Sequence, residues 1–144
     1  MKIRAARSED LDAIKALLAE NGLPVADVDA ALLDDFTVAE DVDGMIVGSV
    51  GLERFGRSAL LRSLATSRKV RKQGLGTRML AHAELIARTA DVCELWLLTT
   101  TAADFFRSSG YTDAARTTAP AEVQASLQFA HLCPASAVCM KLTL

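Results

Sequence analysis

The segment Arg71-Lys72-Gln73-Gly74-Leu75-Gly76-Thr77 joins an apolar run, Leu60 to Thr66, to a stretch with helical periodicity. Neither Gly74 nor Gly76 carries a Cβ atom, so the backbone of this turn can approach a ligand closely. The amides of the turn add to the positive end of the following helix, and the two basic residues supply further positive charge. The segment therefore predicts a phosphate-binding turn, with an ordinary strand-to-helix loop as the alternative.

Two well-known phosphate-binding motifs do not fit this turn. A dinucleotide fold needs Gly-x-Gly-x-x-Gly after the first strand of a βαβ unit, whereas this turn follows an antiparallel meander. A nucleotide-triphosphate loop ends in Gly-Lys-Ser/Thr, and here the residues are Gly74-Leu75-Gly76-Thr77. Both motifs are therefore excluded.

The chain before the turn predicts strands and helices in alternation. The apolar spacing after Ser8 is typical of an amphipathic helix, and Asp43-Gly44 and Gly56-Arg57 are typical of hairpin turns. We expect a strand at 2–5, a helix from residue 8 to Gly22, a short helix at 28–33, and an antiparallel meander of strands at 36–40, 45–53 and 60–66.

The chain after the turn continues the mixed pattern. Apolar residues recur every three or four positions from Leu75 to Arg88, which predicts an amphipathic helix. We then expect a strand at 94–99, a helix at 102–109, a strand from residue 111, a helix at 120–130 and a strand at 137–142. These elements predict one α/β domain over residues 1–144 with a mixed sheet.

Composition limits the classes of partner. The 144 residues carry a net charge of −2, which offers no general attraction to nucleic acid or to an anionic membrane. No apolar run is long enough to span a bilayer, and Met1 to Arg4 lack a secretory signal, so we expect a cytoplasmic protein. The three cysteines have no metal-type spacing and are interpreted as free thiols, and no metal site is expected.

Two motifs together resemble a known family. Leu64-Ala65-Thr66 followed by Arg71-x-x-Gly74-x-Gly76 resembles the coenzyme A signature of the GCN5-related N-acetyltransferases (GNAT). Ala102-x-x-Phe105-Phe106-x-x-x-Gly110-Tyr111 resembles a second signature of that family, found on a helix after the fifth strand. The resemblance implies a mostly antiparallel central sheet, splayed between strands 4 and 5 and flanked by helices, and a transfer of acetyl groups from acetyl-CoA to amines.

The resemblance also implies which residues would contact the cosubstrate. The backbone at 64–66 would hydrogen-bond the pantetheine arm as an added strand, with Leu64 also catalytic, and residues 71–77 would hold the pyrophosphate. The residues expected at coenzyme A are Leu64, Ala65, Thr66, Arg71, Lys72, Gln73, Gly74, Leu75, Gly76, Thr77, Thr100, Ala103 and Phe106. The segments 97–102 and 129–140 further resemble small acetyltransferases associated with arsenic resistance, and the expected acceptor is an amino acid or an amino-acid-like arsenical, phosphinate or related toxin.

A pair of charged residues predicts the amine site. If the hairpin closes at Gly56-Arg57, Glu53 lies opposite Leu60, and Arg62 is its diagonal neighbour on the same face. Glu53 could then accept a proton from the amine, while Arg62 could bind a substrate carboxylate. The alternative is a structural ion pair, and a bulge in either strand would break the inference.

Further residues complete the expected substrate site. Ser63, Thr99 and His131 are assigned to substrate binding, although a loop histidine is also compatible with a solvated or capping role. Phe106 stands where the family often has a tyrosine that protonates the coenzyme A thiolate, so the acid is unassigned. Direct attack by the amine needs no nucleophile from the protein, and an acyl-enzyme at Cys133 is the alternative route.

The sequence leaves three functions open. The first is an N-acetyltransferase for a small primary amine, with a carboxylate on the acceptor suggested by Arg62. The second is a module that senses acetyl-CoA without turnover, and the third is a protein or peptide N-acetyltransferase. No nucleic-acid or membrane partner is expected, and a homodimer is a candidate assembly.

Overall fold

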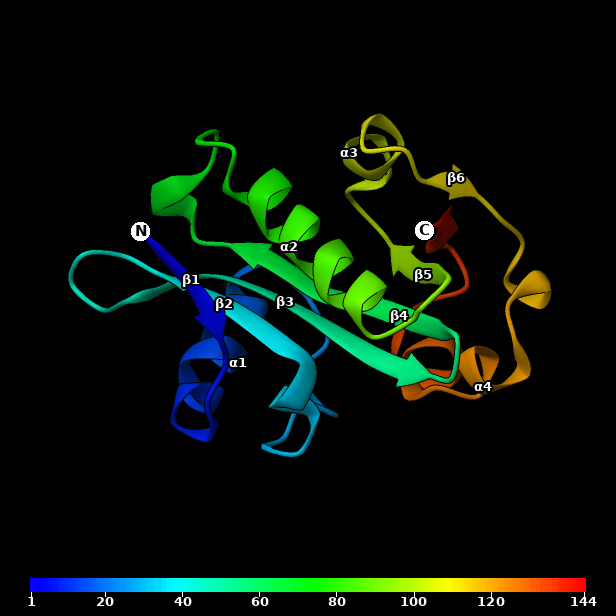
Figure 1. Cartoon of the computed structure of the whole chain (residues 1–144), viewed down its shortest axis with the longest axis horizontal. Coiled ribbons are helices and arrows are strands. Elements are labelled where there is room, and N and C mark those ends of the chain that lie inside the picture. The colour runs from blue at the N-terminus through cyan, green and yellow to red at the C-terminus, as the bar shows by residue number, and fades with distance from the viewer.

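A seven-stranded sheet in the order β1-β2-β3-β4-β5-β7-β6 forms the centre of the structure (Figure 1). The computed structural model describes residues 1–144. The strands are β1 (Lys2–Ala5), β2 (Phe36–Glu40), β3 (Ile46–Phe55), β4 (Ser58–Thr66), β5 (Glu94–Thr99), β6 (Thr112–Asp113) and β7 (Val138–Thr143). All neighbouring strands are antiparallel except β4 and β5, which run parallel. The expected mixed α/β sheet is confirmed.

The hairpins of the meander form where the sequence predicts them. Gly44 and Gly56 adopt φ angles of +78° and +66°, a left-handed conformation that glycine enters without steric cost. The second hairpin pairs Phe55 with Ser58, and therefore places Glu53 opposite Leu60. The expected register of β3 and β4 is confirmed at this end of the hairpin.

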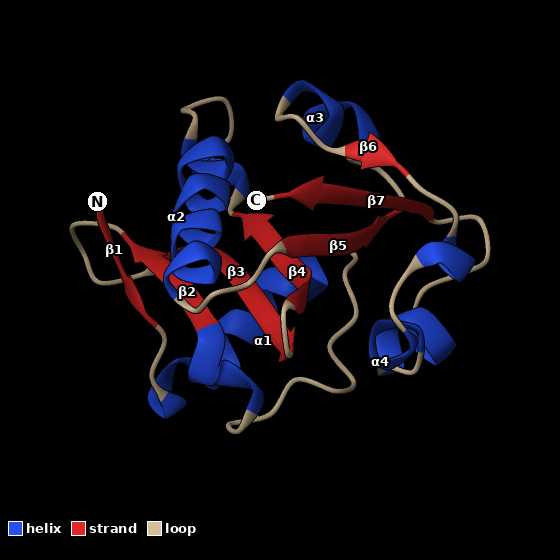
Figure 2. Ribbon diagram, turned by 45° about the vertical axis from the view of Figure 1, so that its right-hand side comes forward, coloured by secondary structure: helices blue, strands red, loops and turns tan.

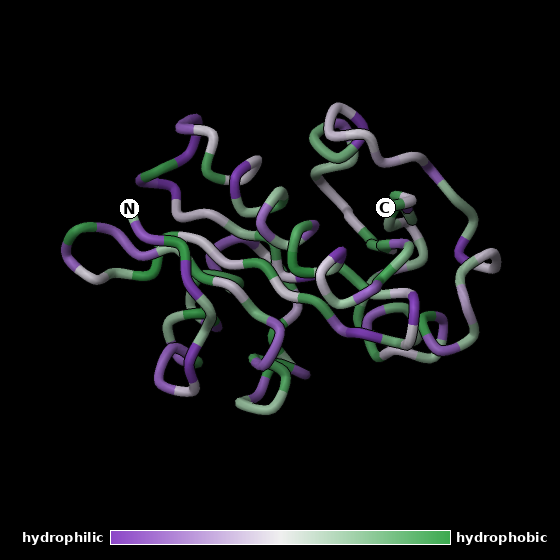
Figure 3. Tube along the Cα trace, viewed as in Figure 1, coloured by the Kyte–Doolittle hydropathy of each residue, from purple (hydrophilic) through white to green (hydrophobic).

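Helices cover both faces of the sheet. Figure 2 shows α2 (Leu75–Thr89) in front of the sheet and α1 (Leu11–Glu20) behind it. The alternation of side chains along β2 explains this arrangement, because Val38 packs in the cluster of α1 and Ala39 in the cluster of α2. Figure 3 shows the turn before α2 as hydrophilic, in contrast to the hydrophobic stretches along the central strands.

The C-terminal third packs around the end of the sheet formed by β5, β7 and β6. The helix α3 (Ala103–Ser108) joins the cluster of α2 through Phe106. The short helix α4 (Ala121–Gln124) and a π-type turn, Gln128–Leu132, pack on the opposite face with Trp96. No helix is both long and apolar enough to cross a bilayer.

The parallel pair β4 and β5 separates along its length. Three residue pairs hold the strands together, ending at Leu60 and Trp96. Beyond this point the two strands continue to Thr66 and Thr99 without pairing, so a gap opens between them. The expected splay between strands 4 and 5 is confirmed.

Two expected helices are wrong in extent. In the region 28–33, the Asp29 carboxylate accepts a hydrogen bond from the amide of Leu32 at 3.0 Å. Because this local bond favours a turn, the helix expected there is replaced by a short 3₁₀ segment, Leu32–Asp35. In the region 120–130, the Ser126 hydroxyl donates to the Val123 carbonyl at 2.6 Å, and the helix ends at Gln124. Short polar side chains compete with the backbone for hydrogen bonds at both positions.

Candidate functional site

The glycine turn forms a small hollow at the start of α2. Gly74 precedes the helix with a φ angle of +76°, and a Cβ atom added there would meet no other atom within 4 Å. A hollow of about 250 Å³ is lined by Thr66, Val70, Arg71, Lys72, Gly74, Leu75, Gly76, Thr77 and Phe105. Because the first amides of a helix have no partner within it, the turn offers donors beside two exposed basic side chains.

Asn21 fixes this turn to the rest of the domain. Its side-chain oxygen accepts from Nη2 of Arg71 at 2.6 Å, and its Nδ2 donates to the carbonyls of Leu17 at 2.9 Å and Thr66 at 3.3 Å. The end of α1, the end of β4 and the turn are therefore linked through one amide side chain. Asn21 belongs to neither of the two motifs that the sequence contains.

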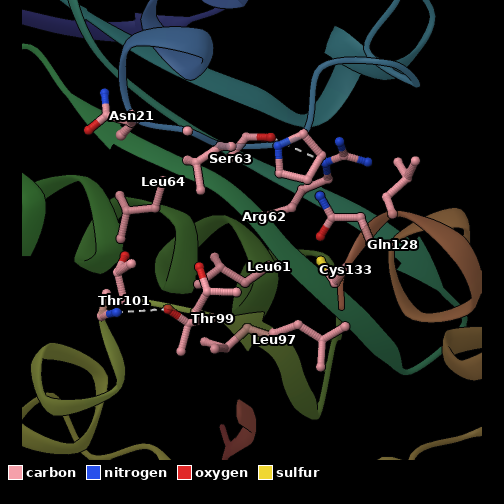
Figure 4. Close-up of a pocket in the computed structure, with 18 of the residues that line it drawn as sticks. Asn21, Leu61, Arg62, Ser63, Leu64, Leu97, Thr99, Thr101, Gln128 and Cys133 are labelled. Carbon is pink, nitrogen blue, oxygen red and sulfur yellow. Dashed lines mark hydrogen bonds between the residues drawn. The ribbon is translucent and has the colours of Figure 1, made fainter. Parts of the chain in front are cut away.

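A larger cavity of about 680 Å³ occupies the gap between β4 and β5. Its walls are residues 61–66 of β4, residues 97–102 along and after β5, the loop 21–26, and residues 128 and 132–134 near the C-terminus. Figure 4 shows side chains from these segments around the cavity. Thr66, Gly76 and Phe105 line both this cavity and the small hollow, so the two spaces adjoin.

A β-bulge interrupts β4 at the middle of the cavity wall. Ser49 pairs with Ala65 and Gly51 pairs with Arg62, which leaves Ser63 and Leu64 opposite Val50 alone. Ser63 has a φ angle of +58°, and its carbonyl accepts from the Ser49 hydroxyl at 2.8 Å. Bulges re-aim backbone groups next to active sites, and this one places Leu64 where the strand turns away from its partner.

Arg62 lies at the floor of the cavity in a buried ion cluster. Its guanidinium donates to both oxygens of Asp27 at 2.5 and 2.6 Å and to Glu53 at 2.6 Å, while Nε donates to the Ser63 hydroxyl at 3.2 Å. Burial opposes the charge, but the hydrogen bonds to the two carboxylates outweigh it and raise the pKa of Arg62. Glu53 and Arg62 therefore share one face of the sheet, in the geometry of the ion-pair alternative.

This geometry corrects the expected role of Arg62 as a carboxylate clamp. Four of its five N–H groups are already used, and its side chain is 0% exposed. A bidentate bond to a substrate would require the guanidinium to leave Asp27. Arg62 is therefore a residue that shapes the floor of the cavity.

The expected base Glu53 also does not line the cavity. The Glu53 side chain is 20% exposed and its carboxylate bonds to Arg62, and neither Glu53 nor Asp27 contributes to the cavity wall. Glu53 therefore positions Arg62 and does not touch the space where a substrate would lie. Asp27 was missed by the sequence analysis, although a buried arginine requires carboxylate partners.

Thr99 and Phe106 line the wall opposite β4. The Thr99 hydroxyl accepts from the amide of Ala102 at 3.0 Å, as Figure 4 shows, and keeps its own hydrogen for a second bond. Phe106 packs edge-on against Phe105 and Tyr111. It contributes shape and no proton donor.

The neighbouring hydroxyls are used elsewhere. Ser109 donates to the carbonyl of Phe105 at 3.1 Å, and Tyr111 donates to Glu84 at 2.9 Å. Burial and the Glu84 carboxylate raise the pKa of Tyr111. Neither hydroxyl lines the cavity, so the acid for a leaving thiolate is not found among them.

Near the C-terminus, the residues that line the cavity include Gln128 and Leu132 but not the expected His131. His131 is exposed and does not line the cavity, because the turn at 128–132 directs Gln128 and Leu132 inward instead. Arg116 holds this segment through the carbonyls of Phe129 and Pro134. His131 is therefore not placed at the substrate site.

Cys133 lies on the same wall, and burial raises the pKa of its thiol. A thiol with a raised pKa stays protonated near neutral pH, and the thiolate is the nucleophilic form. The geometry therefore gives no support to an acyl-enzyme.

Most of the other expected residues lie together. Leu64, Ala65, Thr66, Thr100, Ser63, Thr99 and Phe106 line the large cavity, and Arg71, Lys72, Gly74, Leu75, Gly76 and Thr77 line the adjoining hollow. Gln73 and Ala103 line neither space.

Comparisons with known proteins agree with this arrangement. Residues 33–113 match the model of the acetyltransferase (GNAT) domain. N-acetylglutamate synthase from Neisseria gonorrhoeae, solved with coenzyme A and N-acetyl-glutamate, is 24% identical with a TM-score of 0.86 over 99% of this chain and 35% of that chain. This chain therefore spans about a third of that protein.

Two shorter proteins are similar over their whole length. Rv2747 from Mycobacterium tuberculosis, in complex with CoA and NLQ, is 23% identical with a TM-score of 0.84, covering 100% of this chain and 99% of that one. The PaiA N-acetyltransferase from Thermoplasma acidophilum, in complex with coenzyme A, is 16% identical with a TM-score of 0.71, covering 99% and 98%. At these identities the likeness is one of fold.

Proposed function

Because this chain belongs to the acetyltransferase (GNAT) family, we propose that it transfers the acetyl group of acetyl-CoA to the primary amine of a small, amino-acid-like acceptor. The observation that carries the proposal is the pair of adjoining spaces, one beside the glycine turn and one in the gap between β4 and β5. A single ligand with a pyrophosphate at one end and a thioester at the other fits this sequence of sites.

The residues present fit acetyl-CoA along its length. The amides of 74–77 and the side chains of Arg71 and Lys72 would hold the pyrophosphate, since Gly74 leaves the approach open. The free edge of β4 at 64–66 would bond the pantetheine arm as an added strand. The acetyl group would then lie near the bulge at Ser63.

The chemistry in this proposal is direct attack by the amine. The backbone amide of Leu64 would stabilise the developing oxyanion, and the Thr99 hydroxyl would bind the acceptor or its attacking nitrogen. Among the lining residues only Arg62 and Cys133 are ionisable, so the amine would arrive neutral. As the C–N bond forms and the C–S bond breaks, the nitrogen would lose its proton to solvent and the coenzyme A thiolate would take a proton from solvent. Orientation of the two substrates would supply most of the rate.

The lining beside Arg62 guides the choice of acceptor. Gln128, Leu132, Cys133 and Pro134, on a segment held by Arg116, line the cavity together with Arg62. The similarity to N-acetylglutamate synthase and the resemblance to arsenic-resistance acetyltransferases suggest amino acids and their arsenic or phosphorus analogues as the acceptors to test first.

The experiment is a screen with acetyl-CoA that carries a ¹³C-labelled acetyl group. Amino acids, the amines left after loss of their carboxylates, arsenic and phosphorus analogues, and a mixture of peptides serve as acceptors. We expect release of free thiol together with labelled acetyl on a small amine. Binding of acetyl-CoA without labelling of any acceptor would indicate a sensing module, and labelled peptides alone would indicate a peptide acetyltransferase.

A further inference from the structure

Gln128 is a buried polar residue on the wall of the cavity. It begins the turn Gln128–Leu132, is only 4% exposed, and lines the cavity together with Arg62 and Cys133. Figure 4 shows its carboxamide turned into the cavity on the side of Arg62. The side chain therefore faces the space where the acceptor would lie.

The carboxamide of Gln128 has no partner in the protein. Its neighbour Gln124, in contrast, donates from Nε2 to the carbonyl of Ala119 at 2.7 Å. Nε of Arg4 is the side-chain polar atom that is both fully buried and without a partner. The Gln128 amide, which also lacks a partner, is therefore not fully buried and is open to the cavity. An amide that no protein group occupies and that opens into the cavity is available to bind a polar group of a ligand placed there.

The groups around Gln128 carry both signs of charge. Arg62 is saturated by the carboxylates of Asp27 and Glu53, and the charges of Arg62 and Arg116 lower the pKa of the adjacent Cys133, whereas burial and the charge of Asp27 raise it. The charges on this wall therefore largely balance, and Gln128 supplies two N–H donors that no carboxylate occupies. A carboxylate placed here would gain directed hydrogen bonds that Arg62 cannot offer.

We propose that Gln128 binds the carboxylate of the acceptor and so selects amino acids over simple amines. The inference rests on the proposed function, because it names the substrate group that the acceptor end of the cavity recognises. Gln128 donates from Nε2 to the carboxylate, and the amine of the same acceptor points toward Ser63 and the acetyl group. Arg62 acts as a positioning residue behind them.

A kinetic comparison tests this role. L-leucine and 3-methylbutylamine, which differ by the carboxylate, serve as one matched pair, and the other amino acids with their decarboxylated amines complete the panel. We expect Gln128→Met to lower kcat/KM for the amino acids by about tenfold to a hundredfold and to leave the amines nearly unchanged. Gln128→Glu should lower use of the amino acids further, because like charges repel, and should leave the amines nearly unchanged.

Gln124→Glu is the matched control, four residues away and outside the cavity. It should leave the preference for amino acids unchanged, and melting temperatures of all three variants show whether each is folded. Equal losses for amino acids and amines in folded Gln128 variants would overturn the proposal.

A binding experiment separates this inference from the proposed activity. The chain contains three glutamines, Gln73, Gln124 and Gln128, so selective ¹⁵N labelling gives three side-chain amide pairs, which single substitutions assign. With coenzyme A present, N-acetyl-L-leucine should shift the Gln128 pair and N-(3-methylbutyl)acetamide should not. A shift without any acetyl transfer would retain the carboxylate site and reject the activity, and no selective shift would reject the site.

Discussion

The two ends of the cavity are built in different ways. The end beside α2 consists of backbone amides and glycines within one continuous turn, residues 71–77. The acceptor end is lined by side chains from separate segments, among them Arg62 and Gln128, and Asp27 from a third segment holds Arg62 in place. An anion site made from one turn can be identified from a short motif, whereas a site assembled by folding cannot.

The two ends also differ in how they use their hydrogen-bond donors. At the turn, the first amides of α2 have no partner within the helix, and the proposed pyrophosphate would use them. At the floor of the acceptor end, the N–H groups of Arg62 bond to residues of the protein itself. The donor that has no partner in the protein is the amide of Gln128, which is neutral. A buried charge therefore maintains the shape of the cavity, and a buried amide is available for recognition.

The largest expected effect is at Gly74. Gly74→Val would force a β-branched residue into a φ angle of +76° and tilt the amides that would bind the pyrophosphate. We expect no measurable binding of coenzyme A by calorimetry. Gly44→Val is the matched control, because Gly44 has a φ angle of +78° in equally open space on the β2–β3 hairpin. Unchanged affinity in Gly74→Val would remove the phosphate from this turn.

The next effect concerns the stability of the acceptor end. Arg62→Met would leave Asp27 and Glu53 without their partner, and loss of one member of a buried ion cluster costs about 3–5 kcal/mol. Chemical denaturation should show this loss, and any residual activity should fall alike for acceptors with and without a carboxylate. A selective loss for carboxylate-bearing acceptors would instead restore Arg62 to the binding site.

The control for this change lies on the neighbouring strand. Arg54 pairs with Asp35 at 2.9 Å, but its side chain is 48% exposed. Because an exposed ion pair contributes at most about 1 kcal/mol, Arg54→Met should change stability far less than Arg62→Met.

The smallest expected effect is at Cys133. Burial raises the pKa of this thiol, so it stays protonated at neutral pH and serves as part of the wall. Cys133→Ala should therefore keep kcat close to that of the unmodified protein. Complete loss of activity in a folded variant would support a covalent route through Cys133.

Much of the fold follows from local signals in the sequence. The hairpin at Gly56 sets the register that places Glu53 opposite Leu60, and the periodicity after Leu75 sets α2. The helices expected at 28–33 and 120–130 fail because single side chains, Asp29 and Ser126, close turns that hydrophobic periodicity does not reveal.

Only part of the acceptor end can be predicted from the sequence, and the reason is physical. The face shared by Glu53 and Arg62 follows from strand pairing, but Asp27 comes from a loop whose path the sequence does not define. Without Asp27, the donors of Arg62 look free in the sequence pattern, and the open position of Gln128 is not evident. The imidazole of His131 suits proton transfer, yet the turn that carries it directs Gln128 inward.

Initial rates with acetyl-CoA and the acceptor varied together test the central claim most directly. If both substrates occupy the joined cavity and the amine attacks the thioester itself, double-reciprocal plots should intersect, because a ternary complex forms before any product leaves. Parallel lines would mean that the acetyl group is first passed to the protein and coenzyme A departs. That result would contradict direct transfer within one cavity.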